Sequence, residues 1–379
     1  MALRHLMLSA VAVVGLCGAL GLSGCESVES RMARTYTGDL DILSLQHAGL
    51  RPRWTHTVGL APNEKLKNVW RVGDAIYAAT SQGHLVSVSA SAGTRNWDVD
   101  IGVTAHDIFR PALSTDGKDV IIINQGKVMA VNKLTGGIVA TRDLGFFATT
   151  DPYIMDNVLC VGSSHHFYGL FLDPLGGKKW NIPAAQDYFV ARPAPVGPNG
   201  TALIVAGAET GLLWRLQVAD GDPVWRDRKV NGHVTAGLAS DLRNVYVACM
   251  DGRVYAFDQN NGGSLWDTLL EGKLNLAPVS ASAATLLVPT TGGGLYALST
   301  EKGDIKWRLP DISKIGTVTG DKFYAGDKDG NLLCILVDTG EILSKVKFPG
   351  LANVLPNRTD NLVYVELKDG RIVALEPSK

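Results

Sequence analysis

The sequence has few cysteines, few charged residues and only one long apolar run. It contains 5 cysteines in 379 residues, and Cys160, Cys249 and Cys334 lie far apart inside apolar segments, so we expect buried free thiols and no disulfide or metal site. Charged residues make up 19% and the net charge is −1, so nothing in the charge favours a nucleic acid partner. Glycine is abundant, at 42 residues, which is typical of a strand-rich chain with many tight turns.

The single apolar run is N-terminal, from Leu6 to Leu22, and follows a basic residue, Arg4. This pattern predicts a secretory signal peptide. Its last four residues, Leu22 to Cys25, resemble the bacterial lipobox, in which cleavage precedes the cysteine and the cysteine is acylated. An uncleaved membrane anchor is the alternative, but the run is short and glycine-rich for a spanning helix.

The predicted organisation is therefore a signal peptide at residues 1–24, a lipidated tether at 25–38 and a folded region at 39–379. Several acyl chains on Cys25 would anchor the chain stably to a membrane. Residue 26 is Glu26, and the Asp that tends to hold lipoproteins of enteric bacteria at the inner membrane is missing there. We expect the periplasmic face of the outer membrane.

A glycine followed four residues later by a tryptophan recurs along the chain. The tryptophans are spaced by 83, 45, 41 and 41 residues, and the 83-residue gap is two periods long. Two further units keep the turn glycine but lose the ring, with Ala140 and Ser344 at the tryptophan position. The complete units end at Trp97, Trp180, Trp225, Trp266 and Trp307.

Each unit of about 40 residues contains four short apolar runs separated by turn residues, as in the segment from Asp251 to Trp266. Four such runs predict a four-stranded antiparallel sheet, and a repeat of this length and content is typical of a β-propeller blade. Both faces of these runs are apolar, which fits a blade packed between two neighbours. Each tryptophan is expected to lie against the adjacent blade.

Counting the units predicts an all-β, eight-bladed propeller. Seven units are complete or degenerate, and the eighth begins at Leu351 but stops at the C-terminus with only three strands. The missing strand is predicted near the N-terminus, where Trp54 lies 43 residues before Trp97. An N-terminal strand that completes the C-terminal blade closes the ring without a free edge.

With this strand-turn-tryptophan unit over nearly the whole chain after Cys25, the sequence resembles the PQQ-like repeat family of eight-bladed propellers and lacks the signatures of WD40 blades. Its size, lipobox and closing strand resemble the lipoproteins of that family that assist outer-membrane protein assembly. The resemblance implies a non-catalytic, monomeric propeller that binds envelope proteins, with the barrel-assembly machinery as the expected partner. Two contact motifs of those lipoproteins, Leu-x-Leu-Arg and Asp-x-Asp, are missing at the best-matching segments, 187–190 and 232–234. An envelope scaffold unrelated to barrel assembly therefore stays open.

A second alternative is a quinone-binding dehydrogenase, because PQQ-dependent dehydrogenases share the repeat. The resemblance implies that such enzymes need a tryptophan floor, calcium, a catalytic Asp and often two adjacent cysteines, and no two cysteines are adjacent in this sequence. The segments 327–331, 292–294 and 165–166 are interpreted as turns and not as calcium, phosphate or metal sites. We expect no catalytic residue, cofactor or metal ligand.

Two similar segments precede blades two and four, 107–112 (DIFRPA) and 187–194 (DYFVARPA). Both place aromatic residues and an arginine near the expected central opening, and these residue types are enriched at interface hot spots. The alternative is common ancestry of the blades, with Arg110 and Arg192 paired to carboxylates of the channel. The hypothesis is that a partner-binding face is lined by Phe109, Arg110, Tyr188, Phe189 and Arg192.

Overall fold

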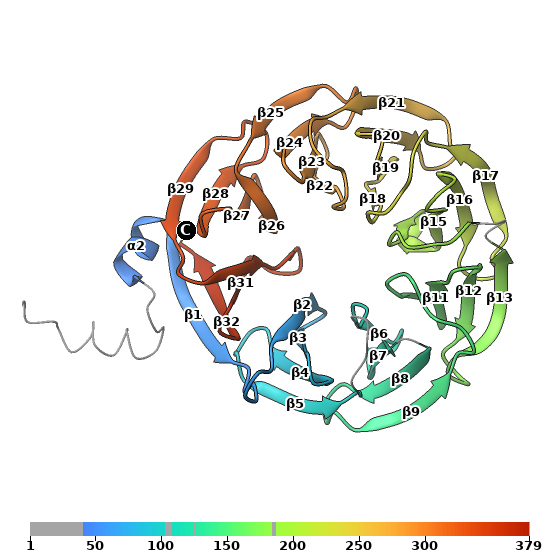
Figure 1. The fold of residues 1–379 in the computed structure, drawn as a ribbon, viewed down its shortest axis with the longest axis horizontal. Coiled ribbons are helices and arrows are strands. Elements are labelled where there is room, and N and C mark those ends of the chain that lie inside the picture. The colour runs from blue at the N-terminus through green and yellow to red at the C-terminus, as the bar shows by residue number, and fades with distance from the viewer. Residues whose placement is uncertain (1–40, 103–107, 125, 184–186, 379) are drawn as a thin grey trace, which may run out of the picture.

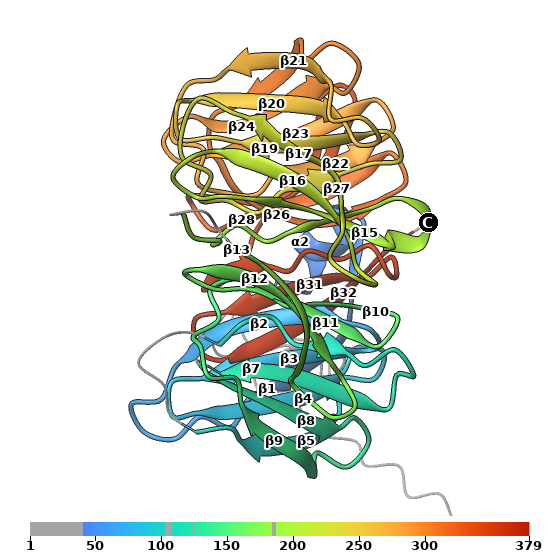
Figure 2. The same cartoon turned by 90° about the vertical axis from the view of Figure 1, so that its right-hand side faces the viewer.

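The computed structural model describes residues 41–102, 108–124, 126–183 and 187–378, and it arranges eight sheets around a central axis (Figure 1). Every sheet has four strands, and every strand pair within a sheet is antiparallel. Figure 2 views the same ring from its side. The prediction of an all-β, eight-bladed propeller is confirmed.

Blades 1 to 4 each use four consecutive strands, numbered from the centre of the ring outward. Blade 1 contains β2 (Leu66–Val72), β3 (Ala75–Thr80), β4 (His84–Ser89) and β5 (Arg95–Asp100). Blade 2 contains β6 (Ala112–Leu113), β7 (Asp119–Asn124), β8 (Lys127–Asn132) and β9 (Ile138–Asp143). Blade 3 contains β10 (Tyr153–Met155), β11 (Val158–Gly162), β12 (His166–Phe171) and β13 (Gly177–Pro183). Blade 4 contains β14 (Ala194–Val196), β15 (Ala202–Ala206), β16 (Leu212–Gln217) and β17 (Pro223–Lys229), with a 3₁₀ turn, η1, at Pro198–Gly200.

Blades 5 to 7 follow the same order. Blade 5 contains β18 (Ala239–Ser240), β19 (Asn244–Ala248), β20 (Arg253–Asp258) and β21 (Ser264–Leu269). Blade 6 contains β22 (Val279–Ser282), β23 (Thr285–Thr290), β24 (Gly294–Ser299) and β25 (Ile305–Leu309). Blade 7 contains β26 (Ile312–Thr319), β27 (Lys322–Asp327), β28 (Asn331–Leu336) and β29 (Ile342–Lys347).

Blade 8 joins the two ends of the chain. Its strands β30 (Leu351–Val354), β31 (Val363–Leu367) and β32 (Arg371–Pro377) come from the C-terminus, and β1 (Leu50–Thr57) pairs with β32 as the outermost strand. Trp54 lies opposite Ala374 in this pairing. A short helix, α2 (Ile42–His47), precedes β1, and Asp41 caps it by accepting two backbone N–H groups. The predicted closing strand is confirmed.

Each repeat tryptophan packs between two blades. The indole Nε1 of Trp266 donates to the carbonyl oxygen of Thr300 in the next blade at 3.0 Å. The turn glycine of that next blade, Gly303, has a φ of +76°, and a Cβ there would lie 2.5 Å from the Trp266 ring. The same donor bond to the next blade is made by Trp54, Trp97, Trp180, Trp225 and Trp307. The glycine-to-tryptophan spacing is thus a device for stacking blades.

The two degenerate units replace the ring by other contacts. Next to Ala140, the turn glycine Gly176 faces Val128, Arg142 and Leu144. Ser344 donates its hydroxyl to the carbonyl oxygen of Ala48, just after α2, at 3.1 Å. In blade 7, the end of helix α2 therefore takes the place that the turn of the next blade has beside each repeat tryptophan.

Several smaller expectations can be compared with the structure. Cys160, Cys249 and Cys334 are buried free thiols, as predicted. The segments 327–331 and 292–294 are hairpin turns, and His165 and His166 lie at the turn between β11 and β12, also as predicted. No helix in the described ranges is long and apolar enough to cross a membrane. The signal peptide, Cys25 and the tether lie outside those ranges, and the domain boundaries remain predictions.

Candidate functional site

Three charged residues occupy equivalent positions around the central channel. Arg110, Asp151 and Arg192 each precede a proline that leads into the innermost strand of blades 2, 3 and 4, and they are spaced by 41 residues. The equivalent positions in the next two blades are small, Gly237 and Ala277. A Cβ on Gly237 would lie 3.1 Å from the Cβ of Arg192 and 3.3 Å from that of Ala277. Across blades 2 to 6, this position is therefore charged in the first three blades and small in the last two.

The three charged residues contact one another. The Oδ1 of Asp151 accepts the backbone N–H of Arg110 at 3.1 Å, and its Oδ2 lies 4.0 Å from the Nε of Arg192. The Nη2 of Arg110 donates to the carbonyl oxygen of Arg71 in blade 1 at 2.7 Å. Burial, followed by the charge of Arg192, lowers the pKa of Arg110 to about 10, against the opposing effect of Asp151. Arg110 thus keeps its charge at neutral pH, and within the described ranges its guanidinium donates to the carbonyl oxygen of Arg71.

The segment before Arg192 is fixed by Asp187, which is 4% exposed. Its carboxylate accepts the backbone N–H groups of Glu209 at 2.9 Å and Thr210 at 3.0 Å, and also the Thr210 hydroxyl. Burial alone would raise the pKa of Asp187, but the Thr210 hydroxyl and these N–H groups hold it below its usual value. Asp187 therefore clamps the entry segment to the hairpin between β15 and β16.

The five residues of the partner-face hypothesis do not share one environment. Phe189 is 1% exposed and packs edge-on against Phe167 at 5.5 Å and Trp214 at 5.7 Å, measured between ring centroids. It belongs to the core between blades 3 and 4, so its assignment to a partner face is wrong. Phe109 and Tyr188 are half-buried, and the Arg192 side chain is 51% exposed. Arg192 is the most accessible polar group of the set.

Two residues of this site were missed from sequence. Asp151 was not singled out, although an Asp-Pro step at the same 41-residue spacing as the two Arg-Pro steps was a usable signal. Arg71 has no such signal, because its carbonyl is brought to Arg110 by the packing of blade 1 against blade 2. The alternative interpretation pairs both arginines with carboxylates of the channel. Arg192 has such a neighbour in Asp151, whereas the guanidinium of Arg110 donates to a backbone carbonyl.

The described residues contain no group of three or more His, Cys, Asp or Glu side chains that could hold a metal ion. The repeat tryptophans donate to neighbouring blades and lie inside the blade interfaces, so none of them forms an open floor for a ring-shaped cofactor. The entry segments therefore present one accessible charged side chain, Arg192, and two half-buried aromatic side chains, Phe109 and Tyr188.

Eight blades, six of which donate a tryptophan to the next blade, closed by an N-terminal strand define a propeller of the PQQ-like repeat class. The model of the family described as outer membrane protein assembly factor BamB matches residues 33–226 and 209–342, so the chain belongs to that family.

Curated relatives named outer membrane protein assembly factor BamB match over most of their length. The protein of Yersinia pestis is 21% identical over 96% of this chain and 98% of its own. The protein of Bordetella pertussis is 23% identical over 95% of each chain.

Solved structures show the same fold. BamB from Moraxella catarrhalis superimposes with a TM-score of 0.67 at 20% identity, covering 86% of this chain and 97% of that one. The quinohemoprotein alcohol dehydrogenase of Comamonas testosteroni superimposes with a TM-score of 0.65 at 12% identity, covering 89% and 78%. At these identities the likeness shows the fold alone.

Proposed function

We propose that this chain is a lipid-anchored scaffold on the periplasmic face of the outer membrane, where it binds the machinery that assembles outer-membrane proteins. The observation that carries the proposal is membership of the BamB family across most of the chain. The predicted lipobox at Cys25 supports the anchor. The accessible side chain of Arg192 and the half-buried Tyr188 of the same entry segment support the channel mouth as the contact face.

A photocrosslinking amino acid placed at Arg192 in native membranes tests the contact. We expect adducts with subunits of the barrel-assembly machinery, and we expect Arg192→Glu to reduce their co-purification. Arg226, on the outermost strand of the same blade and 67% exposed, is the matched control position. Adducts with other envelope proteins only, or equal adducts from both positions, would reject the proposal. Fractionation of the same membranes tests the anchor: we expect the chain in the outer-membrane fraction, and we expect Cys25→Ala to release it from the membrane.

We infer that the role is non-catalytic. The engagement of the repeat tryptophans inside blade interfaces supports this inference. Titration of the purified protein with pyrroloquinoline quinone and calcium, followed by absorbance, is expected to show only the spectrum of the free quinone. A saturable spectral change that requires both components would contradict it.

A further inference from the structure

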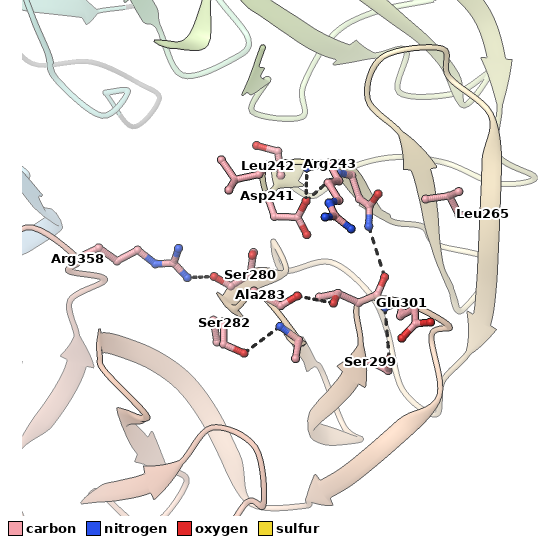
Figure 3. A pocket seen from close by; sticks show the side chains of 15 residues that line it. Asp241, Leu242, Arg243, Leu265, Ser280, Ser282, Ala283, Ser299, Glu301 and Arg358 are labelled. Atoms are coloured by element: carbon pink, nitrogen blue, oxygen red, sulfur yellow. Dashed lines mark hydrogen bonds between the residues drawn. The ribbon is translucent and has the colours of Figure 1, made fainter. Parts of the chain in front are cut away.

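A large cavity lies away from the entry segments. It is a groove of about 980 Å³ between the turns that follow β18 in blade 5 and β22 in blade 6. Residues such as Arg192 precede the innermost strands, whereas these turns follow them, so the groove opens at the opposite ends of the strands. Figure 3 shows Arg358, from blade 8, reaching one end of the groove, with Leu265 and Glu301 at the other end.

The groove is open because one bridging side chain is short. Gln259 and Thr300 are equivalent, since the carbonyl oxygen of each accepts the Nε1 of the preceding blade's tryptophan. The amide of Gln259 spans the junction of blades 4 and 5, accepting from the backbone of Gly197 and donating to the carbonyl of Leu242. The hydroxyl of Thr300 donates only within its own blade, to the carbonyl of Ala283 at 2.7 Å. At the junction of blades 5 and 6 the bridging contact comes from the other side, where the amide of Asn244 donates to the carbonyl oxygen of Thr300 at 3.4 Å. The Thr300 side chain itself does not reach blade 5.

The charged groups of the groove are unequally satisfied. The carboxylate of Asp241 accepts the backbone N–H groups of Arg243 and Asn244 and the hydroxyl of Tyr246, so it is occupied within its own turn. Arg358 donates to the carbonyl oxygen of Ser280, and the described part of the chain supplies no carboxylate partner for Arg358 or Arg243. Two arginines therefore face the groove without a bound carboxylate, and the remaining charged group, Glu301, lies at the end opposite Arg358 (Figure 3).

The wall beside these arginines is apolar. Leu242 is 94% exposed at the tip of its turn, and Leu265 is 48% exposed on the outermost strand. Small side chains, Ala281, Ala283 and Ala284, line the other side. The volume lies at the upper end of the range of about 300–1,000 Å³ found for ligand pockets, far more than one small anion fills.

We propose that this groove binds an acidic chain segment of a protein partner. One carboxylate of the segment would bind Arg358, another would bind Arg243, and an apolar side chain would pack against Leu242. The charges and the exposed leucine select such a segment. The groove lies at the opposite ends of the strands from the proposed contact with the assembly machinery, so this contact is separate from that one.

A labelled peptide tests the proposal on the purified full-length protein. We expect a fluorescein-labelled Glu-Leu-Glu-Leu-Glu peptide to bind by fluorescence anisotropy, and its glutamine counterpart to bind about tenfold more weakly or worse. Arg358→Gln removes the charge, and Thr300→Gln fills the groove as Gln259 fills the neighbouring junction. Each is expected to weaken binding by about tenfold or more. The controls are Arg226→Gln and Thr339→Gln, both exposed and distant from the groove.

Circular dichroism and the thermal midpoint establish whether each variant is folded. If Thr300→Gln does not fold, the binding measured for Arg358→Gln tests the proposal by itself. Failure of the acidic peptide to bind up to about 1 mM would overturn the proposal. So would equal binding by Arg358→Gln and the wild type, or by the acidic and glutamine peptides. Displacement of the peptide by inorganic phosphate at constant ionic strength would also overturn the proposal, because it would mean that the groove binds small anions and not a chain segment.

Discussion

At the residue scale, the turn glycines carry two separate constraints, positive φ and contact with a tryptophan. Gly303 and Gly350 have the same φ of +76°, but a Cβ on Gly303 would lie 2.5 Å from the Trp266 ring, whereas a Cβ on Gly350 would meet nothing within 4 Å. Gly350→Ala is therefore expected to cost about 1–2 kcal/mol of unfolding free energy, from backbone strain alone. Gly303→Ala is expected to cost about 1–3 kcal/mol more, because the indole must move. Urea unfolding of both variants measures the difference, and equal losses would show that the glycine is kept for the turn only.

At the element scale, the sequence predicts what depends on periodicity. The spacing of the tryptophans located the outermost strands, the start of β30 at Leu351 and the closing strand β1, because each blade repeats one strand order. It did not predict that Phe189 turns inward, since an aromatic residue in an entry segment can pack between blades or face the channel. It also did not reveal the groove, which depends on Thr300 being shorter than Gln259 in a comparison across blades. The pattern of one repeat unit thus predicts the strands of a blade, but it does not predict the side-chain contacts between neighbouring blades.

At the scale of the whole molecule, a partly buried ionic cluster bridges the seam between blades 8 and 1, where Asp360 of blade 8 meets Arg71 on β2 of blade 1. Asp360 accepts from the Nη2 of Arg71 at 3.0 Å, from the Nδ2 of Asn357 at 2.7 Å and from the hydroxyl of Tyr364 at 2.9 Å. Burial alone would raise the pKa of Asp360, but Arg71, Asn357 and Tyr364 hold it below its usual value. Burial, followed by the hydrogen bond to Asp360, raises the pKa of Tyr364 to about 12, so its hydroxyl keeps donating at neutral pH.

This cluster predicts how the stability of the ring responds to acid. Because the pKa of Asp360 is lower in the folded state, the unfolded state binds more protons as the pH falls below about 5, and the unfolding free energy declines. Asp360→Asn is expected to lower stability at neutral pH, since Arg71, 6% exposed, loses its carboxylate. It is also expected to make the decline between about pH 5 and pH 3 shallower, because one proton-linked group is removed. Urea unfolding of both proteins across that range measures the two slopes, and identical slopes would mean that other carboxylates account for the acid sensitivity of the ring.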